Sequence, residues 1–460
     1  MGLVERLETR FDVQEHETSV RTEVLAGVTT FLTMSYIVVV NPSILSAAIT
    51  IDGVPTGEII SMLAIVTILS AAVATLIMAL YANRPFAQAP GLGLNAFFAF
   101  TVVGALGIPW QTALAAVVVE GLLFIFLTAV GAREFIVKVF PAPVKFAVGT
   151  GIGLFLTIIG LEAMGIVVDD PATLVTLGAV ASDPIAIISL VGLFATFIMY
   201  AREIPGSIIL GILGTTALGW LAVSGGLFAP DSGLVAGPAT VTYDITPLAG
   251  AFLAGLGDIQ AFTFALIVFT FFFVDFFDTA GTIVGVGQAG GFLDDEGNLP
   301  DVDRPLMADA VGTTIGGALG TSTVTTYIES ASGVEAGGRT GLTALTVVAL
   351  FLVSLIFVPL ATVIPLYASH IALVVIGILM LRNVADIAWD DITVTIPAGL
   401  TILIMPFTYS IAYGIAAGII SYPLVKLAAG RTDELRPAHW ALALAFVGYF
   451  IVQTGGILTG

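Results

Sequence analysis

Apolar runs long enough to cross a lipid bilayer recur from one end of this chain to the other. The hydrocarbon core of a bilayer is about 30 Å thick and an α-helix rises about 1.5 Å per residue, so each run of about 20 apolar residues predicts one crossing. Hydrophobic residues make up 58% of the sequence and charged residues only 10%, a composition that excludes an ordinary soluble domain. We therefore expect an all-α polytopic membrane protein.

The apolar runs form two sets, separated by a polar stretch that ends near residue 258. The first set predicts spans at 24–46, 59–82, 93–104, 111–131, 144–165, 185–201 and 204–226. The second set predicts spans at 261–287, 306–320, 323–335, 341–363, 367–382, 391–406, 409–428 and 438–457. The Lys and Arg residues between these spans can all be placed on one side of the membrane, which predicts a cytoplasmic N-terminus.

An odd number of spans per half would leave two similar halves in opposite orientations, the layout of an inverted-repeat transporter. The predicted divisions are a cytoplasmic tail (1–23), a first repeat (24–230), a second repeat (258–428) and an additional C-terminal hydrophobic segment (438–457). Residues 1–23 lack the apolar core of a cleavable signal peptide, so the first span is expected to remain in the membrane.

The eighth span carries two acids among phenylalanines, Asp275 and Asp278. A carboxylate near the centre of a bilayer costs roughly 2.5–3.5 kcal/mol on insertion scales, so such residues are usually functional. The spacing places both acids on one side of the helix, with Thr282 one turn beyond Asp278. Asp278 precedes a Thr-Ala-Gly break and is predicted to bind a ligand, together with Thr279. Asp275 and Thr282 are expected to support it, and the alternative for Asp275 is a hydrogen bond to a neighbouring helix.

Two short spans, one in each half, contain sequences that cannot form continuous helices. Residues 84–100 include Pro85 and Pro90, and residues 320–333 form a β-branched run that favours an extended strand. Irregular backbone at membrane depth survives only where it lines a cavity or is buried in protein. Matching broken segments in the two halves therefore predict a binding site near the middle of the membrane, to which Glu329 would contribute a carboxylate.

The residues around these breaks favour a flat, polar, heteroaromatic ligand. Asp278 and Glu329 would accept hydrogen bonds from its N–H groups, and the two short extended segments, one of them around Asn95 and Ala96, would present backbone amides and carbonyls to it. Phe97, Phe98 or a phenylalanine of the eighth span would stack on it. Glu120 and Glu162 are interpreted as structural or interfacial acids, and residues 149–153 (GTGIG) as a close helix-packing surface.

Composition excludes several other functions. The net charge of −19 argues against binding to nucleic acid, and acidic loops with few lysines suggest adaptation to high salt. The absence of cysteine excludes disulfides and thiolate metal sites, and the three histidines are too scattered for a metal centre. We expect no cofactor, no metal and no catalytic residues.

Four motifs closely resemble those of the AzgA-like purine permeases, within the nucleobase–ascorbate (xanthine/uracil permease) transporter superfamily. These are residues 25–45 (LAGVTTFLTMSYIVVVNPSIL), 89–100 (APGLGLNAFFAF), 273–287 (FVDFFDTAGTIVGVG) and 321–342 (TSTVTTYIESASGVEAGGRTGL). The resemblance covers nearly the whole chain and implies fourteen spans in two inverted repeats, with short antiparallel strands in spans three and ten. It also implies a core (24–135 and 258–363) and a gate (140–230 and 366–428).

The resemblance assigns substrate binding to Asp278 in the eighth span and to Glu329 in the tenth. In the third span it places Asn95, Ala96 and Phe97 in a strand beside the substrate. The chain departs from better-known members of the superfamily after Glu329, where Ser-Ala-Ser-Gly intervenes, and this favours the AzgA-like branch.

The expected function is import of adenine, guanine and hypoxanthine across the plasma membrane by proton symport with alternating access, in which Asp278 or Glu329 takes the coupling proton. The expected partners are a purine nucleobase, protons and the lipid bilayer, and the sequence leaves both a monomer and a homodimer open. Alternatives are an exchanger of sulfate or dicarboxylate with the same architecture, a sodium-coupled nucleobase transporter and a passive channel.

Overall fold

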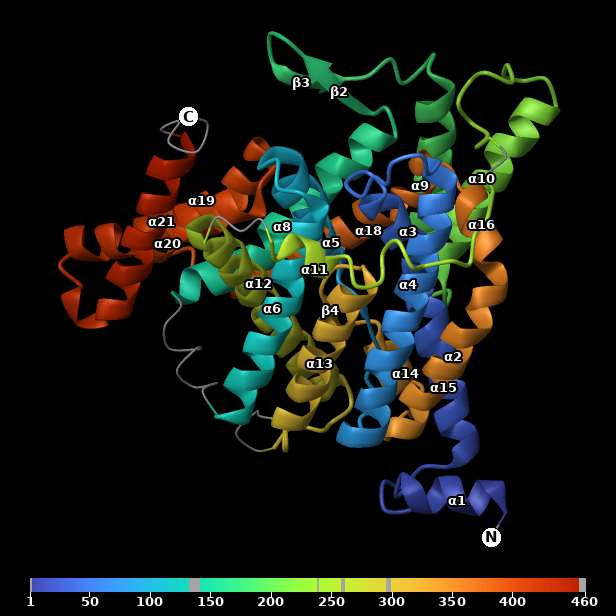
Figure 1. Ribbon diagram of the computed structural model, residues 1–460, viewed down its shortest axis with the longest axis horizontal. Helices are drawn as coiled ribbons and strands as arrows, with labels where there is room; N and C mark the ends of the chain where they lie inside the picture. The colour runs from blue at the N-terminus through green and yellow to red at the C-terminus, as the bar shows by residue number, and fades with distance from the viewer. Residues whose placement is uncertain (1, 132–140, 238–239, 258–260, 295–298, 455–460) are drawn as a thin grey trace.

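The computed structural model describes residues 2–131, 141–237, 240–257, 261–294 and 299–454. These residues form a mostly helical protein (Figure 1), in which ten helices are long and apolar enough to cross a membrane. Three shorter apolar helices lie between 92 and 105, 392 and 408, and 437 and 448. The prediction of a polytopic helical membrane protein is therefore confirmed, and the described residues supply ten long spans.

The elements of the first half are α1 (Leu3–Arg10), α2 (Val20–Met34), α3 (Ile37–Leu45), α4 (Thr56–Ile77), η1 (Met78–Ala82), β1 (Gln88–Pro90), α5 (Leu92–Ala96), η2 (Phe97–Ala105), α6 (Trp110–Ala129), α8 (Ala142–Ala163), β2 (Val167–Asp170), β3 (Leu174–Leu177), α9 (Pro184–Ala201) and α10 (Ser207–Ser224). In the wider helices η1 and η2 the backbone has π geometry. The β2–β3 hairpin was not expected from the sequence.

The elements of the second half are α11 (Phe252–Gly255), α12 (Ala261–Ala289), α13 (Asp303–Leu319), β4 (Val324–Thr326), α14 (Ser330–Glu335), α15 (Gly341–Ser354), η3 (Leu355–Phe357), α16 (Val358–Val363), α17 (Leu366–Ser369), α18 (Ile371–Met380), η4 (Leu381–Asp386), α19 (Ile392–Thr408), α20 (Ile411–Ala428), η5 (Thr432–Glu434) and α21 (Pro437–Thr454). The additional segment predicted at 438–457 corresponds to α21, which packs against α20 and touches α12.

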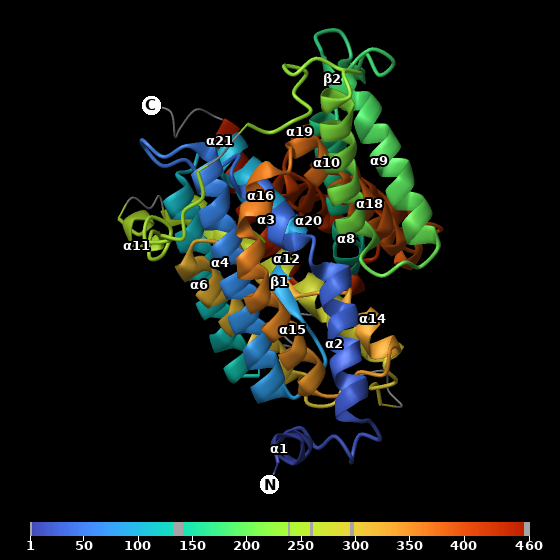
Figure 2. The same cartoon turned by 90° about the vertical axis from the view of Figure 1, so that its right-hand side faces the viewer.

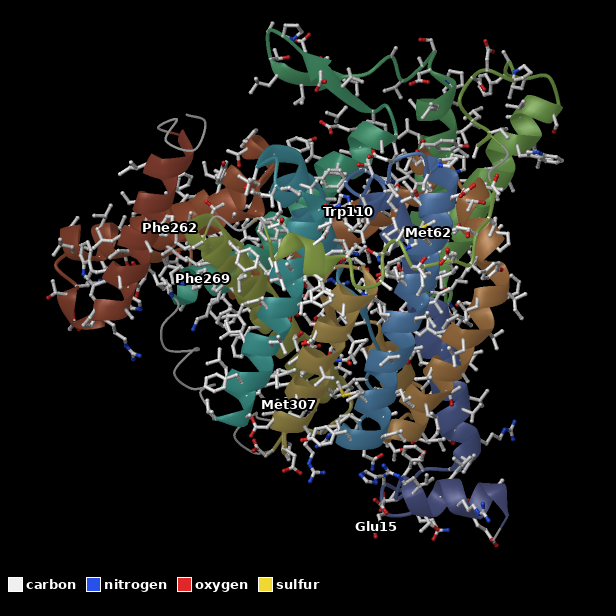
Figure 3. The ribbon with its side chains drawn as sticks, viewed as in Figure 1. Glu15, Met62, Trp110, Phe262, Phe269 and Met307 are labelled. Atoms are coloured by element: carbon white, nitrogen blue, oxygen red, sulfur yellow. The ribbon has the colours of Figure 1, made fainter. Side chains whose placement is uncertain are left out.

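The helices pack as two groups. The first group contains α2, α4, α6, α12, α13 and α15, and the second contains α8, α9, α10, α18, α19 and α20. Figure 2 shows α9 and α10 on the opposite side of the molecule from α4 and α6. Within the first group, Trp110 at the start of α6 and Met307 near the start of α13 lie towards opposite ends (Figure 3), so these two closely packed helices are antiparallel.

Two short strands from distant parts of the chain pair inside the first group. β1 and β4 are antiparallel, with Gln88 opposite Thr326 and Pro90 opposite Val324. All six strand residues are buried, and the backbone of Gln88 also exchanges hydrogen bonds with the Thr75 hydroxyl of α4. The pairing supplies hydrogen-bond partners for backbone groups that a broken helix would leave unpaired in the membrane. The short antiparallel strands that the family resemblance implied are therefore confirmed.

A buried carboxylate holds α2 against the start of α15. Glu23 accepts hydrogen bonds from the backbone amides of Arg339 (2.9 Å), Thr340 (3.2 Å) and Thr343 (3.2 Å), and from the Thr343 hydroxyl (2.6 Å). The first amides of a helix have no partner within the helix and favour negative charge. Glu23 of α2 thus supplies both a hydrogen-bond acceptor and a negative charge to the start of α15.

Glycine residues allow the helices of the second group to approach closely. A Cβ on Gly153 of α8 would lie 2.5 Å from the Gly377 carbonyl oxygen of α18, and one on Gly377 would lie 2.4 Å from the Gly153 oxygen. A Cβ on Gly151 would lie 2.5 Å from the sulfur of Met405. The interpretation of 149–153 as a close packing surface is confirmed, because small residues let helix backbones meet.

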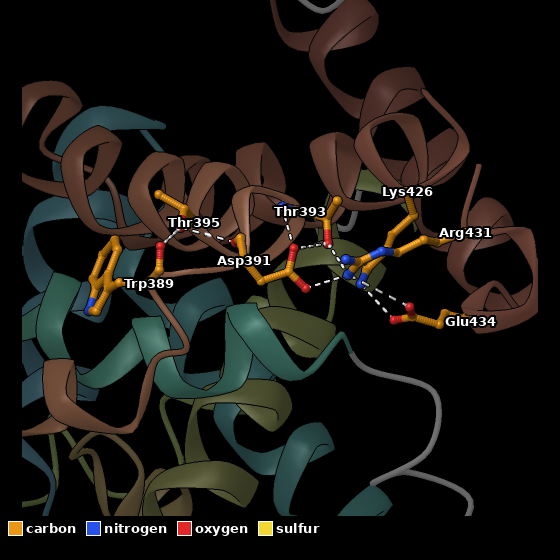
Figure 4. A network of polar contacts seen from close by, with 7 residues as sticks. All are labelled: Trp389, Asp391, Thr393, Thr395, Lys426, Arg431 and Glu434. Carbon is orange, nitrogen blue, oxygen red and sulfur yellow. Dashed lines mark hydrogen bonds and ion pairs between the residues drawn. The ribbon is translucent and has the colours of Figure 1, made fainter. Parts of the chain in front are cut away.

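A polar network joins the start of α19 to the segment after α20 (Figure 4). Asp391 accepts hydrogen bonds from the backbone amide (2.9 Å) and the hydroxyl (2.7 Å) of Thr393 and forms an ion pair with Arg431. Lys426 donates to Glu434 at 2.6 Å. The bonds from Thr393, and then the Arg431 charge, lower the pKa of Asp391 to about 2.

Replacing Glu23 with alanine should destabilise the fold. Three buried amides and one hydroxyl would lose their acceptor, and leaving such donors unpaired costs about 1–3 kcal/mol. We expect a lower midpoint temperature for thermal unfolding of the purified protein in detergent. Glu15→Ala is the matched control, because Glu15 is exposed near α1 (Figure 3). Equal midpoints for both variants would contradict the role assigned to Glu23.

The Asp391 carboxylate should stabilise the fold above about pH 4 and lose this effect at lower pH. Its pKa is lowered in the folded protein from an unfolded value of about 3.9, so the charged form favours folding, and the contribution disappears as the pH falls through the folded pKa. Asp391→Asn should therefore lower the unfolding midpoint at pH 7, with a difference from the unsubstituted protein that shrinks towards pH 2. Asp390→Asn, at an exposed neighbour, controls for the loss of one surface charge.

Candidate functional site

One face of α12 is open to solvent although the helix runs through the middle of the protein. Asp278, Gly281 and Gln288 are exposed, and Thr282 and Gly285 between them are partly exposed. The spacing of three to four residues places these positions on one face. A Cβ built on Gly281 meets no atom of the described residues within 4 Å, so open space adjoins the Asp278 turn.

Figure 3 shows Phe262, near the start of α12, on the upper side of the protein and Glu15, after α1, at the opposite end. We refer to the exposed side of α12 from Asp278 to Gln288 as the open face.

The opposite face of α12 is buried. Asp275, Thr279 and Ile283 are fully buried. The Thr279 hydroxyl lies 2.6 Å from that of Thr325 and 3.0 Å from the Asp309 carboxylate, so it points away from the open face. The structure thus separates Thr279 from Asp278, and it places Thr282 beside the open face.

Asp275 makes contacts with a neighbouring helix. The hydroxyl of Thr313 on α13 lies 3.5 Å from its carboxylate, and that of Thr279 lies 3.4 Å from it. These contacts agree with the alternative that Asp275 bonds to a neighbouring helix. Its burial keeps it out of contact with the open face.

Glu329 lies where the strand β4 gives way to helix α14, as the sequence predicted. The Tyr36 hydroxyl donates a hydrogen bond of 2.6 Å to its carboxylate. Tyr36 is buried at the break between α2 and α3. Glu329 is partly exposed. Ile328, beside it, is exposed and would lie 3.4 Å from a Cβ on Gly285, so this segment borders the open face.

The prediction that Asn95, Ala96 and Phe97 form a strand is wrong. The strand is formed by Gln88–Pro90, and the three residues lie in α5 and at the first position of η2. Gly91 is extended and begins the helix, and the Asn95 amide donates to the Gly91 oxygen at 2.8 Å. The backbone amides of these residues are therefore directed along the helix and not towards a ligand. The helix begins directly after Gly91, earlier in the chain than we expected from the sequence.

All three of these residues are buried. The Asn95 amide group donates to the Pro90 oxygen at 3.4 Å and accepts from the Ser322 hydroxyl, so it ties α5 to the segment before β4. The Phe97 ring meets the edge of Phe271 on α12, with centroids 4.7 Å apart. Asn95 and Phe97 support α12 and β4 in this structure, and neither side chain lies on the open face.

Sequence reasoning missed three residues of this region: Tyr36, Gln88 and Asp309. Asp309 is buried on α13 and accepts hydrogen bonds from Gln88 (2.9 Å) and from the Thr326 hydroxyl (3.0 Å). Asp309 could have been found from the sequence, because it is an acid inside the predicted span 306–320, the same feature that identified Asp278. Nothing in the sequence paired Tyr36 with Glu329, which lies 293 residues away.

Comparison with known proteins identifies the family. The model of a family described as "Permease family" matches residues 21–417. The chain belongs to this family. It is similar to a putative permease of Methanocaldococcus jannaschii, at 43% identity over 98% of this chain and 99% of the relative. These matches confirm the resemblance to the xanthine/uracil permeases.

Two further relatives have more specific names. The adenine permease AdeP of Escherichia coli is 40% identical over 97% of this chain and 95% of its own length. The guanine/hypoxanthine permease PbuG of Bacillus subtilis is 41% identical over 97% of this chain and 99% of its own length. Both are permeases and not enzymes.

The fold is similar to that of a structurally characterised transporter. The transmembrane domain of a cyanobacterial bicarbonate transporter, BicA, superposes with a TM-score of 0.59 over 89% of this chain and 97% of that domain, at 16% sequence identity. At this identity the match concerns the fold alone, a mostly helical membrane-transporter architecture.

Cysteine accessibility should test the open face, since the natural chain contains no cysteine. Gly281→Cys and Gln288→Cys should react with a charged, membrane-impermeant thiol reagent, because both positions are exposed. Ile283→Cys is the control on the buried side of the same helix and should react slowly or only after unfolding. Labelling would be measured by mass spectrometry of the purified protein. Equal labelling at all three positions would contradict the two-sided helix.

Proposed function

We propose that this chain is a secondary active transporter that imports purine nucleobases, namely adenine, guanine and hypoxanthine, by proton symport. The names of the adenine and guanine/hypoxanthine permeases, each about two-fifths identical over nearly the whole chain, support the substrate class. The proposed location is the plasma membrane, with the N-terminus in the cytoplasm.

Two observations support this proposal: Asp278 is exposed on the open face, and Glu329 is partly exposed in the segment that borders this face. An ionised carboxylate only accepts hydrogen bonds, and a purine presents several N–H donors in one plane. Two acceptors from separate segments can hold such a plane in a fixed orientation. Tyr36 holds Glu329 in place by its hydrogen bond, so the site is partly organised without a ligand.

Proton coupling is proposed to act through the same two residues. A charged carboxylate within the membrane is unfavourable, so protonation lowers the free energy of an unoccupied site and changes which hydrogen bonds the site offers. Asp278 or Glu329 would take the coupling proton, which makes protonation and purine binding interdependent.

Alternating access is proposed to occur by movement of the first helix group against the second. In this proposal the helices of the first group, which lie within 24–135 and 258–363, form the core, and those of the second group, within 140–230 and 366–428, form the gate. Fourteen spans in two inverted repeats, with α21 as an addition, remain the proposed topology. The antiparallel strands β1 and β4, one in each proposed repeat, support it.

The alternative of a sulfate or dicarboxylate exchanger draws on the fold shared with a bicarbonate transporter. The chemistry of the open face disfavours it, because two carboxyl groups repel an anionic substrate. A sodium-coupled nucleobase transporter uses the same substrate site and differs only in the ion that drives uptake.

Replacing Asp278 with asparagine should abolish concentrative purine uptake. The variant loses a charged acceptor, worth about 1.5–3 kcal/mol per hydrogen bond, so purine affinity should fall about 10- to 100-fold. Uptake of radiolabelled adenine, guanine and hypoxanthine into proteoliposomes with an imposed pH gradient measures this. Glu162→Gln is the matched control, as a partly buried acid on α8 away from the open face. Full proton-driven accumulation by the Asp278→Asn protein would overturn the assignment.

The same proteoliposomes separate the alternatives. Proton symport predicts that a protonophore abolishes purine accumulation and that a sodium gradient alone does not drive it. Sodium coupling predicts that a sodium gradient alone drives accumulation and that a protonophore leaves it unchanged. A passive channel equilibrates purine without accumulation. Exchange of labelled sulfate, with no uptake of purine, would replace the proposal with the anion exchanger.

A further inference from the structure

Three carboxyl groups lie buried behind the open face: Glu120 on α6, Asp275 on α12 and Asp309 on α13. Each is fully buried, and the three helices pack against one another. We refer to Glu120, Asp275 and Asp309 as the carboxyl triad. The carboxyl triad cannot contact a ligand at the open face, because all three of its side chains are fully buried.

A threonine hydroxyl connects two members of the carboxyl triad, and the third accepts a hydrogen bond from the segment before β4. Glu120 Oε2 lies 3.4 Å from the Thr323 hydroxyl. The Thr279 hydroxyl lies 3.4 Å from Asp275 Oδ1 and 3.0 Å from Asp309 Oδ2, so it bridges these two acids.

Among the described residues of α6, α12 and α13, no base forms an ion pair with the carboxyl triad. Along the described helices α6, α12 and α13, the ionisable residues other than the triad are Asp278, Asp303 and Arg304. Arg304 is exposed at the start of α13. β1 and β4, which also pack here, carry no ionisable residue, and the next acid after β4 is Glu329.

Two buried acceptor atoms in this region lack a donor among the described residues. Gln88 directs its amide nitrogen at Asp309 Oδ1 (2.9 Å), yet its buried Oε1 has no hydrogen-bond partner. Glu120 Oε1 is also buried and receives no hydrogen bond from a donor group. Buried polar atoms are nearly always paired, so unpaired acceptors beside three carboxyl groups point to a bound proton as the missing donor.

Energetics lead to the same conclusion. Three negative charges buried on adjoining helices, with no cation paired to them among the described residues, would carry a large desolvation cost and repel one another. Protons remove both penalties and convert an acceptor-only group into a donor.

We propose that the carboxyl triad is a proton-holding site, separate from Asp278 and Glu329. Resting on the proposed symport, we further propose that the triad, in place of Asp278 or Glu329, holds the proton that crosses the membrane, and that Asp278 and Glu329 hold the purine. Asp275 and Asp278 lie one turn apart on α12 and their charges interact, so the occupancy of one site affects the other.

Transport assays on three single variants, Glu120→Gln, Asp275→Asn and Asp309→Asn, test the coupling role. An inward gradient of about one pH unit supports about tenfold accumulation for one coupled proton per purine. The variants should bind purine as the unsubstituted protein does and should exchange labelled purine at equal pH. Under the gradient they should only equilibrate purine. Glu162→Gln should accumulate purine normally. Normal accumulation by all three triad variants would overturn the coupling role.

Infrared spectroscopy of the unsubstituted protein without purine tests the protonated state directly. A carboxylic-acid C=O stretching band should be present at neutral pH and should shift only slowly after transfer to D₂O, because the acids are buried. The band should weaken in Glu120→Gln and stay unchanged in Glu162→Gln. Absence of the band from the unsubstituted protein would overturn the proposal even if every triad variant failed to fold.

The two measurements separate this proposal from the proposed function. If the unsubstituted protein neither binds nor transports purine, the proposed function fails, while the infrared band still decides whether the triad holds protons. If purine uptake is proton-driven and the band is absent, the proposed function stands and the triad proposal fails.

Discussion

The pairing of β1 with β4 is the interaction on which the rest of the site depends. A chain that leaves helical geometry inside a membrane must satisfy its backbone groups elsewhere, and here each broken segment supplies the partners for the other. This pairing fixes where α5 and α14 begin. It therefore fixes the positions of Asn95 and Glu329, although the two residues belong to opposite halves of the chain.

The two faces of α12 give the same type of side chain two different environments. Asp278 is exposed on the open face, whereas Asp275, one turn earlier, is fully buried, as are Glu120 and Asp309. A carboxyl group that must release its ligand needs access to water, and one that must keep a proton needs to be shielded from it. The helix provides both within one turn.

Local signals in the sequence predicted the membrane helices, the broken segments and the importance of Asp278 and Glu329. Hydrophobicity, proline and β-branched residues act over a few residues and can be read directly. The strand register could not be read, because Pro90 and Gly91 permit either an extended or a helical continuation towards Asn95. Contacts between distant elements, such as Tyr36 with Glu329 and Gln88 with Asp309, depend on packing that no local pattern encodes.

The reciprocal contact of Gly153 and Gly377 has a mechanical consequence. Backbone atoms of α8 and α18 approach closely where these two glycines meet, so this part of the contact cannot adjust by rotamer changes and we expect the two helices to stay fixed relative to each other. Contacts of α12 and η2 with α8 and α20 are sparse by comparison. The carboxyl groups of α12 therefore lie on the helix that borders the sparsely packed boundary between the two groups.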